Sequence, residues 1–333
     1  MRMSFHYFTT KALCVRAGFS TAEAQVIAYA CQYVDDAQEH EEIRILGLPE
    51  PFYERMGRDS LDPTCTAHKG IENILYNFDG VRRKVLLPFH FMPTGWNAAH
   101  TKFNYLAKAE SPPARDLVRL ALQKLRSTPP ESEFRELELI RLGIALHTYE
   151  DTFAHQNFSA RNNRMENGAS EILIRVNKRV RHLQAIFYLT GFLGYSIGHG
   201  LLGTFPDRFN TRISYLNGRN KEVSINTTPR FRVACKRVYY LLREYTLAPD
   251  NWKEEWKRLR NCLKWDQSRK TDIKKTFSAH YPEIDFSYTA SAWKRQALKL
   301  YVPGSYVFKG DMKWLNFHRA SWDQRQYVLS FLP

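Results

Sequence analysis

Three titratable side chains inside an apolar helical segment constrain this chain most. His147, Asp151 and His155 recur at every fourth position. Successive steps of four residues in an α-helix rotate by only about 40°, so the three side chains share one stripe. The residues before them, 143–146, are apolar, and Phe153 lies within the motif, which indicates a buried helix. Burying three such groups costs several kcal/mol unless they are paired or bind a metal.

The chemistry of the stripe favours a metal ion. Imidazole nitrogens and carboxylate oxygens are the ligands that zinc-class cations prefer. A carboxylate between two histidines, as Asp151 is, can bridge two ions. The alternative is a polar helix face that carries two ordinary histidines. The apolar surroundings favour the metal, zinc or another divalent ion.

Other ligand-type residues occur in apolar or glycine-rich settings elsewhere in the chain. Each of them alone is more often an ordinary core or surface residue than a ligand. Together they point to one shared polar centre. The candidates are His6, Asp35, Asp36, His68, His90, His199 and Asp207.

Helix signals are many and strand signals are scarce, so the sequence predicts an all-α fold. Ser20 and Glu23 have the spacing of a capping box, and Ser111 before Pro112 suits a helix start. The segment 85–93 is short, apolar and bounded by prolines, which predicts a buried extended segment. The other expected helices are 69–78, 97–108, 112–126, from about 131 past 153, 171–197, 230–245, 251–265, 289–300 and 321–331.

Positive charge and tryptophan are concentrated in the C-terminal part. Of the formal net charge of +15, residues 208–333 carry most, with 25 Lys and Arg against 11 Asp and Glu. Six of the seven tryptophans lie there as well. We therefore expect a metal-binding domain over residues 1–215 and a basic, mostly helical extension over 216–333. A basic, aromatic-rich segment favours an anionic partner, although a solvated basic surface would give the same composition.

Cysteine usage and hydropathy bear on the compartment. The five cysteines are scattered and form no CxxC pair, so reduced thiols are expected rather than a disulfide framework. We find no apolar run near the roughly 18 residues that span a bilayer and no ordered secretory signal. These features predict a cytoplasmic protein, or one exported without a cleaved signal peptide.

Several segments together resemble an uncharacterised bacterial family, the domain of unknown function DUF6765. The resemblance covers about residues 4–210. The segments that carry it are 5–7, 17–19, 27–37, 66–68, 88–93, 147–158 and 198–207.

More distantly, the helix with His147, Asp151 and His155 is similar to the zinc-dependent phospholipase C and S1/P1 nuclease superfamily. That resemblance implies an all-α bundle in which three zinc ions hydrolyse phosphodiesters. It makes the three helix residues ligands, with Asp151 bridging. By the same resemblance His6, His68 and His199 are ligands, Asp35 or Asp36 is the metal-binding, water-activating aspartate, and Asp207 completes one metal.

Two departures from that superfamily affect the number of ions. The superfamily uses the amine and carbonyl of a processed N-terminal tryptophan as ligands, whereas this chain starts with Met1. It also places a carboxylate four residues after the late histidine, where this chain has Gly203. Two-metal and three-metal centres are therefore both open.

The resulting prediction is a zinc-dependent phosphodiester hydrolase of the phospholipase C kind. No GxSxG elbow, P-loop or GxGxxG fingerprint offers a rival chemistry. Phospholipid is slightly favoured as substrate, with the basic C-terminal part as the docking surface for its anionic heads. The alternatives are an S1/P1-type nuclease acting on DNA or RNA, and a non-catalytic interaction protein stabilised by metal.

Overall fold

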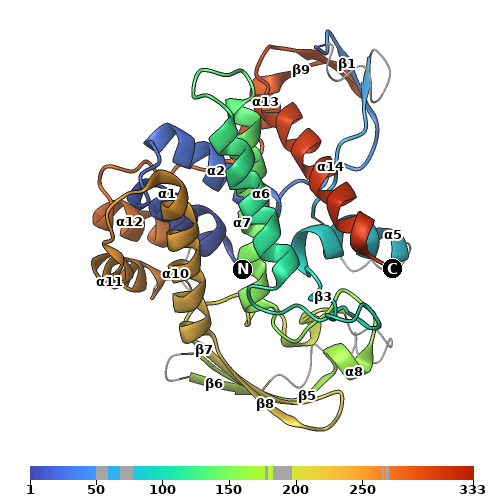
Figure 1. Cartoon of the computed structure of the whole chain (residues 1–333), viewed down its shortest axis with the longest axis vertical. Coiled ribbons are helices and arrows are strands. Elements are labelled where there is room, and N and C mark those ends of the chain that lie inside the picture. The colour runs from blue at the N-terminus through green and yellow to red at the C-terminus, as the bar shows by residue number, and fades with distance from the viewer. Residues whose placement is uncertain (50–58, 68–77, 177–178, 183–196, 265, 267–269) are drawn as a thin grey trace.

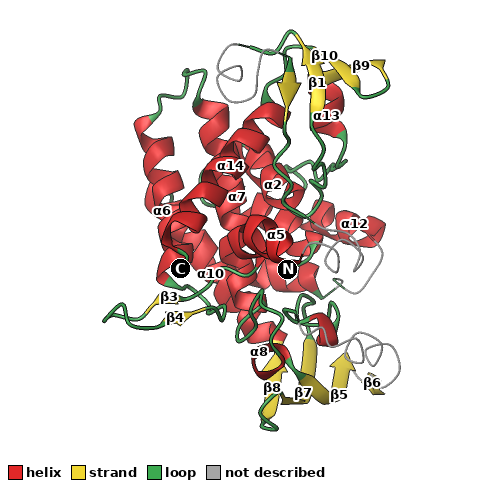
Figure 2. Ribbon diagram, turned by 90° about the vertical axis from the view of Figure 1, so that its right-hand side faces the viewer, coloured by secondary structure: helices red, strands yellow, loops and turns green. Residues whose placement is uncertain are grey.

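Helices form the middle of the molecule and β-sheets lie at its two ends (Figure 2). The computed structural model describes residues 1–49, 59–67, 78–176, 179–182, 197–264, 266 and 270–333. About 52% of the chain is helical and 14% is in strands. The prediction of an all-α fold is therefore wrong, because the chain is mixed α/β.

The helices pack around α7, which runs through the centre (Figure 1). Ser20 accepts a hydrogen bond from the backbone of Glu23, which confirms the capping box at the start of α2. Among the described residues, no helix is long and apolar enough to cross a membrane. The helices of eight or more residues are α2 (Thr21–Tyr33), η3 (Arg82–His90, a π-helix), α6 (Pro112–Ser127), α7 (Arg135–Ala154), α10 (Thr227–Thr246), α11 (Trp252–Leu263), α12 (Lys270–His280) and α14 (Lys313–Phe331). The shorter ones are η1 (Ser4–Thr9, a π-helix), α1 (Thr10–Arg16), α5 (Phe78–Val81), α8 (Arg164–Asn167), η4 (Gly200–Leu202, a 3₁₀ helix) and α13 (Ala292–Ala297).

The described strands form three sheets. One has the order β2-β1-β10-β9, with β1 parallel to β10 although about 260 residues separate them. A second has the order β6-β5-β7-β8 and is antiparallel throughout, and the third is the pair β3-β4. The strands are β1 (Ile43–Leu46), β2 (Ser60–Leu61), β3 (Gly95–Trp96), β4 (Phe103–Asn104), β5 (Ala169–Val176), β6 (Arg179–His182), β7 (Thr211–Asn217), β8 (Glu222–Asn226), β9 (Leu298–Val302) and β10 (Ser305–Phe308).

The predicted helix 171–197 is wrong where the structure describes it, because β5 and β6 form a hairpin there. Ile172 and Ile174 are buried while Leu173 and Arg175 between them are more exposed. This alternation has the period of two that a strand requires. The overall apolar content of the segment masked that period. Residues 183–196 lie outside the described part of the chain.

Three further local predictions are wrong. Residues 97–108 contain a loop and β4, which pairs with β3. Residues 85–90 belong to η3, so this proline-bounded segment is helical and not extended. Only Ala292–Ala297 of the predicted helix 289–300 is helical, and β9 follows at once. The predicted helix 69–78 lies almost wholly outside the described residues.

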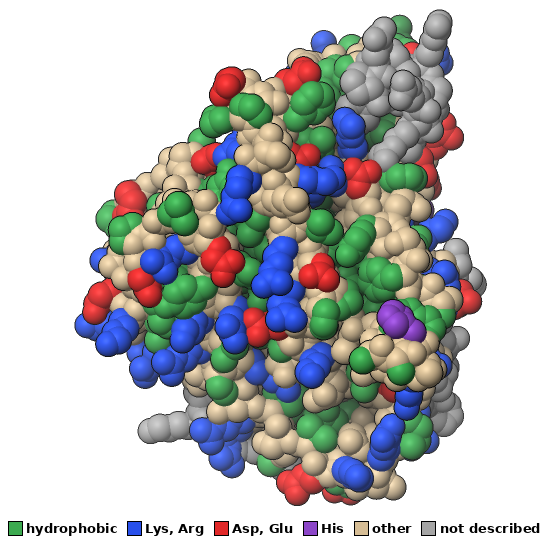
Figure 3. Space-filling view, in the orientation of Figure 1, with side chains coloured by type: hydrophobic (Ala, Val, Ile, Leu, Met, Phe, Trp, Pro, Cys, Tyr) green, Lys and Arg blue, Asp and Glu red, His purple; other side chains and the backbone are tan. Residues whose placement is uncertain are grey.

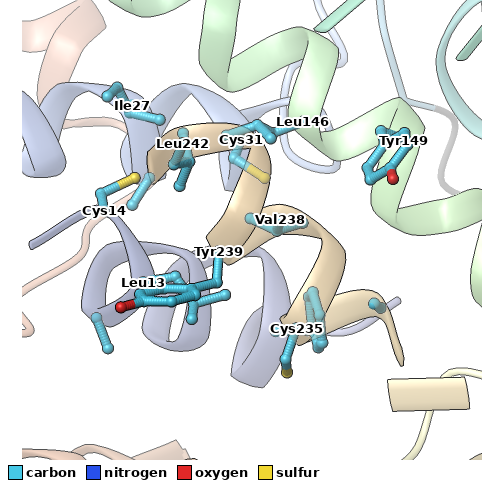
Figure 4. Packing of buried hydrophobic residues seen from close by; sticks show 14 of the residues in the cluster. Leu13, Cys14, Ile27, Cys31, Leu146, Tyr149, Cys235, Val238, Tyr239 and Leu242 are labelled. Atoms are coloured by element: carbon cyan, nitrogen blue, oxygen red, sulfur yellow. The ribbon is translucent and has the colours of Figure 1, made fainter. Parts of the chain in front are cut away.

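Apolar side chains from both halves of the chain fill common cores. In the largest cluster, residues of α1, α2 and α7 pack against α10; Figure 4 shows Leu13, Ile27 and Leu146 around the helix that carries Val238. In a second cluster Trp314 of α14 lies with Tyr33 and Ile140. Side chains from both sides of residue 215 therefore lie in the same two clusters, while the domain division itself stays a prediction.

Close contact between α2 and α7 depends on Gly143. A Cβ atom added there would lie 2.3 Å from the carbonyl oxygen of Ile27 and 2.7 Å from Cβ of Ala30. The first contact is with a backbone atom and the second with a short side chain that cannot rotate away. An added Cβ could therefore fit only if one helix shifted. The glycine thus sets the distance between the two helices that carry or precede several site residues.

Gly143→Ala is expected to destabilise the fold by about 1–3 kcal/mol through overpacking, although alanine has the higher helix propensity. Urea unfolding of the metal-free protein measures this change. Gly200→Ala is the matched control, since nothing lies within 4 Å of its added Cβ. Equal stabilities of the two variants would contradict the close-contact role of Gly143.

Candidate metal centre

The face of α7 predicted from sequence lies in the interior. His147 and Asp151 are 0% and 1% exposed, and His155, which caps the helix, is 5% exposed. Nε2 of His147 lies 3.4 Å from Oδ2 of Asp151, which confirms that these side chains share one face. Since nearly all of α7 is buried, polar groups on this face must be satisfied from within the protein.

Four imidazoles are fixed by backbone carbonyl groups. A carbonyl oxygen only accepts, so the ring nitrogen that bonds it must carry the proton. The donor nitrogens are Nδ1 of His147 to Cys31 (2.8 Å), Nε2 of His90 to Thr66 (2.8 Å), Nδ1 of His155 to His90 (2.7 Å) and Nδ1 of His199 to Gly203 (2.8 Å). In the neutral ring the other nitrogen of each is left as a lone-pair donor, which is the form that binds a metal.

The free nitrogens of His90 and His147 face each other. Nδ1 of His90 lies 3.2 Å from Nε2 of His147, so at most one of the two can carry a proton. Oδ1 of Asp35 lies 4.0 Å and 3.7 Å from these two atoms. Oδ2 of Asp151 lies 3.3 Å from the His90 nitrogen. Four electron-pair donors thus converge on one point, which we call subsite A.

A second group, subsite B, forms around Asp207. Nε2 of His155 lies 3.1 Å from Oδ1 of this carboxylate, and Nε2 of His199 lies 3.4 Å from Oδ2. Phe91 stacks on the His155 ring with centroids 4.5 Å apart. The ring orientation in subsite B is therefore fixed by both a carbonyl group and an aromatic face.

The third group, subsite C, contains His6, Asp151 and the amine of Met1. Nε2 of His6 lies 3.2 Å from Oδ1 of Asp151, and the Met1 amine contacts the same oxygen. The amine is also 3.7 Å from Oδ1 of Asp207. Nε2 of His6 is fully buried without a hydrogen-bond partner, as expected of an atom that ligates a metal. Asp151 thus gives one oxygen to subsite A and the other to subsite C.

Glu150 holds His6 from behind. Its Oε2 lies 2.8 Å from Nδ1 of His6, and its Oε1 accepts from the hydroxyl of Thr10 at 2.7 Å. Burial raises the pKa of Glu150 to about 8. An ionised Glu150 accepts from Nδ1 of His6 and leaves its Nε2 free to face Asp151, so metal binding at His6 requires loss of the Glu150 proton. Carboxylate–histidine pairs of this kind orient many metal-binding imidazoles.

The electrostatics of the centre are those of a cation site. Burial opposes ionisation of Asp151 and Asp207, but nearby histidines and the amine lower the pKa of both. Burial alone would lower the pKa of the Met1 amine, yet Asp151 and Asp207 raise it to about 11. Burial and the neighbouring His147 hold the pKa of His6 well below its ordinary value. At subsite A the shifts run the other way: despite its burial, the hydrogen bond to Asp151 raises the pKa of His90, and burial raises the pKa of Asp35. Metal binding, which requires neutral imidazoles and ionised carboxylates, competes with protons at these two groups.

Most of the predicted ligands come together, from five separate places in the chain. Those in the three subsites are His6, Asp35, His147, Asp151, His155, His199 and Asp207. Asp36 lies outside them, because its Oδ2 accepts from the hydroxyl of Tyr288 at 2.7 Å and from Gln32 at 3.2 Å. Asp36 was the expected metal ligand, with Asp35 as the open alternative; the structure places Asp35 at subsite A instead. His68 lies outside the described residues.

Three contributors were missing from the predicted set. His90 stood among the candidates from its setting between Phe89 and Phe91, but was not assigned as a ligand. Glu150 precedes Asp151 in a helix of buried residues, which is a usable signal for a buried carboxylate. The Met1 amine has no signal in the residue pattern, because its position depends on tertiary contacts.

Comparison with known proteins places the chain in a family. The model of the Family of unknown function (DUF6765) matches residues 1–332. The chain belongs to this family. The match extends through the C-terminal part, beyond the residues 4–210 from which the resemblance was drawn. No curated protein and no solved structure matches the chain. The similarity to the phospholipase C and S1/P1 nuclease superfamily therefore stays a hypothesis.

The chain is expected to bind two or three zinc-class ions, and Asp151→Ala is expected to lose at least one of them. This change removes the carboxylate that subsites A and C share. Elemental analysis after gel filtration measures the ions per chain. Asp36→Ala is the control and should keep the full content. Unchanged metal content in Asp151→Ala would contradict the assignment.

Proposed function

We propose that this protein is a metal-dependent phosphodiester hydrolase. One observation supports this most: four imidazoles whose N–H is fixed by a carbonyl group, together with His6 held by Glu150, direct their other nitrogens at the buried Asp151 and Asp207 and the partly exposed Asp35. Subsite A has four and subsite B three protein ligands of the nitrogen and oxygen types that suit zinc. Subsite C has His6 and Asp151; its Met1 amine, which Asp151 and Asp207 keep protonated by raising its pKa, binds a metal only after losing that proton. Two or three such ions would neutralise phosphate charge and lower the pKa of water.

The accessibility of the centre favours catalysis over a structural role. The side chain of Asp35 is 33% exposed, whereas those of His147 and Asp151 are 0% and 2% exposed. Structural zinc sites are closed by four protein ligands, while catalytic sites keep an open position. Solvent reaches this centre at Asp35, so we assign this carboxylate to orienting water and accepting its proton.

For the substrate we propose a phospholipid at an anionic surface. α11 carries Lys253, Lys257 and Arg260 as exposed basic residues at helical spacing, and the exposed Lys264 continues the spacing as its C-cap. Figure 3 shows Lys and Arg side chains gathered over α10 and α11. Each basic residue near an anionic membrane adds about 1 kcal/mol of attraction.

A nucleic acid is the second candidate substrate, and one contact favours it. The guanidinium of Arg232 on α10 lies 6.0 Å from the ring centroid of Trp256 on α11. A basic helix surface interleaved with aromatic rings also suits a single strand with its bases stacked. Hydrolysis of lipid vesicles against hydrolysis of DNA or RNA decides between the two substrates.

Asp35→Asn is expected to lower hydrolysis of a small soluble diester by about 100-fold or more, the contribution of a positioned base. Chelation should abolish the activity, and added zinc should restore it. Asp36→Asn is the matched control and should stay close to wild type. Metal-independent hydrolysis would overturn the proposed mechanism.

Lys257→Glu with Arg260→Glu is expected to weaken binding to anionic vesicles by about 10-fold or more, with soluble-diester turnover unchanged. Vesicle co-sedimentation at two salt concentrations measures this binding. Arg295→Glu with Lys299→Glu changes net charge equally at exposed positions of α13 and β9. Equal losses in both double variants would show that net charge, and not the α11 surface, determines docking.

A further inference from the structure

Asp266 is a buried carboxylate that connects two distant segments of the chain. Its side chain is 0% exposed. Oδ1 accepts a hydrogen bond from the hydroxyl of Ser4, and Oδ2 accepts from the backbone N–H of Phe209 at 2.8 Å. Its carbonyl oxygen accepts from Arg2 at 2.6 Å. Desolvating an ionised carboxylate is costly, so its two directed hydrogen bonds must be compensating.

The two connected segments both lead into the metal centre. Ser4 lies three residues after Met1, whose amine contacts Asp151. Phe209 lies two residues after Asp207, whose Oδ1 is 3.7 Å from the same amine. Asp266 therefore stands behind subsites B and C, at the C-terminal end of α11.

Aromatic side chains also pack between the Met1 and Asp207 segments, a contact we call the junction. They do not fix how the two segments align. Phe231 of α10 packs against Phe5 and Phe209, with ring centroids 5.3 Å and 5.7 Å away. Apolar contacts are non-directional, so rings alone tolerate small shifts of either segment. The carboxylate of Asp266 supplies directed bonds that set the position of both segments.

We infer that Asp266 is a positioning residue that holds the Met1 and Asp207 segments together and so assembles subsites B and C. This inference rests on the proposed metal centre. It gives the basic C-terminal part a second role, because a residue beyond α11 then determines the geometry of ligands from the first 207 residues. Subsite A, formed by Asp35, His90, His147 and Asp151, has no residue from either of the two segments that Asp266 connects and meets the Met1 segment only through the shared Asp151.

Two substitutions separate position from charge. In Asp266→Asn the amide oxygen can accept from Phe209, and the amide N–H can donate to the Ser4 hydroxyl, which also accepts. The neutral side chain therefore keeps both bonds. Asp266→Ala removes both. If position matters, the asparagine variant resembles wild type and the alanine variant does not.

The first measurement uses metal-free protein. The Met1 amine is 0% exposed, so it should react slowly with an amine-specific acylating reagent. Asp266→Ala should speed acylation of this amine by about tenfold, since each lost buried hydrogen bond is worth about that factor. Mass spectrometry of the N-terminal peptide measures the rate. An unchanged rate in Asp266→Ala would overturn the inference.

The second measurement is zinc titration against a chromophoric chelator. Asp266→Ala should weaken binding at two subsites by about 10- to 100-fold, the range that groups orienting metal ligands contribute. Binding at the remaining subsite should be unchanged. If Asp266→Asn binds zinc as weakly as Asp266→Ala, the charge of Asp266 and not its hydrogen bonds would be what matters, which would overturn the inference.

The acylation and zinc measurements together allow the inference and the proposed function to fail separately. Wild-type protein that binds no zinc would overturn the proposed function, while the acylation rates would still test the junction. If Asp266→Ala fails to fold, Ser4→Ala removes one of the two bonds and should give the same changes at smaller size. Unchanged acylation and zinc affinity in folded Ser4→Ala would then contradict the role of Asp266.

Discussion

The buried carboxylate of Asp151 is the interaction on which the rest of the structure depends. It is 1% exposed, and its two oxygens face different groups of ligands. Oδ1 faces His6 and the Met1 amine, and Oδ2 faces His90 and His147. A lone carboxylate at this depth would be costly, so the cations that it attracts are part of the folded state. Segments 150 residues apart meet at this one side chain.

The fold serves the centre by supplying hydrogen-bond acceptors behind it. The carbonyl groups that fix the imidazoles belong to residues near the ends of α2, η3 and η4 and to Thr66 in the loop after β2, and Glu150 of α7 contacts His6. These acceptors set which nitrogen is free and where it points. The tight contact at Gly143 and the shared cores around α10 and α14 hold those acceptors in place. Core packing and ligand chemistry are thus directly coupled in this protein.

The ligands on α7 were predictable because one local period encodes them. His147, Asp151 and His155 follow the helix repeat, and Ser20 with Glu23 marks the start of α2 by a local rule. Asp35 could not be separated from Asp36 by sequence, since only the tertiary hydrogen bond to Tyr288 assigns the latter elsewhere. The Met1 amine could not be predicted from a local pattern either, because only tertiary contacts place it beside Asp151.

The strands were missed because their local signals are weak. In β5 the alternation of Ile172 and Ile174 spans few residues, and a register shift between Ser170 and Leu173 interrupts it. The pairing of β1 with β10 joins the two ends of the chain, so the burial of these strands depends on distant residues. Short strands with long-range partners depend on tertiary context more than on propensity.

Anomalous scattering from crystals grown with zinc, recorded on both sides of the zinc edge, tests the central claim most directly. The account predicts two or three peaks, with one oxygen of Asp151 directed at subsite A and the other at subsite C. Ligand distances should be about 2.0–2.2 Å. A map without peaks, in which Asp151 is held by histidines and the amine through hydrogen bonds alone, would contradict the account.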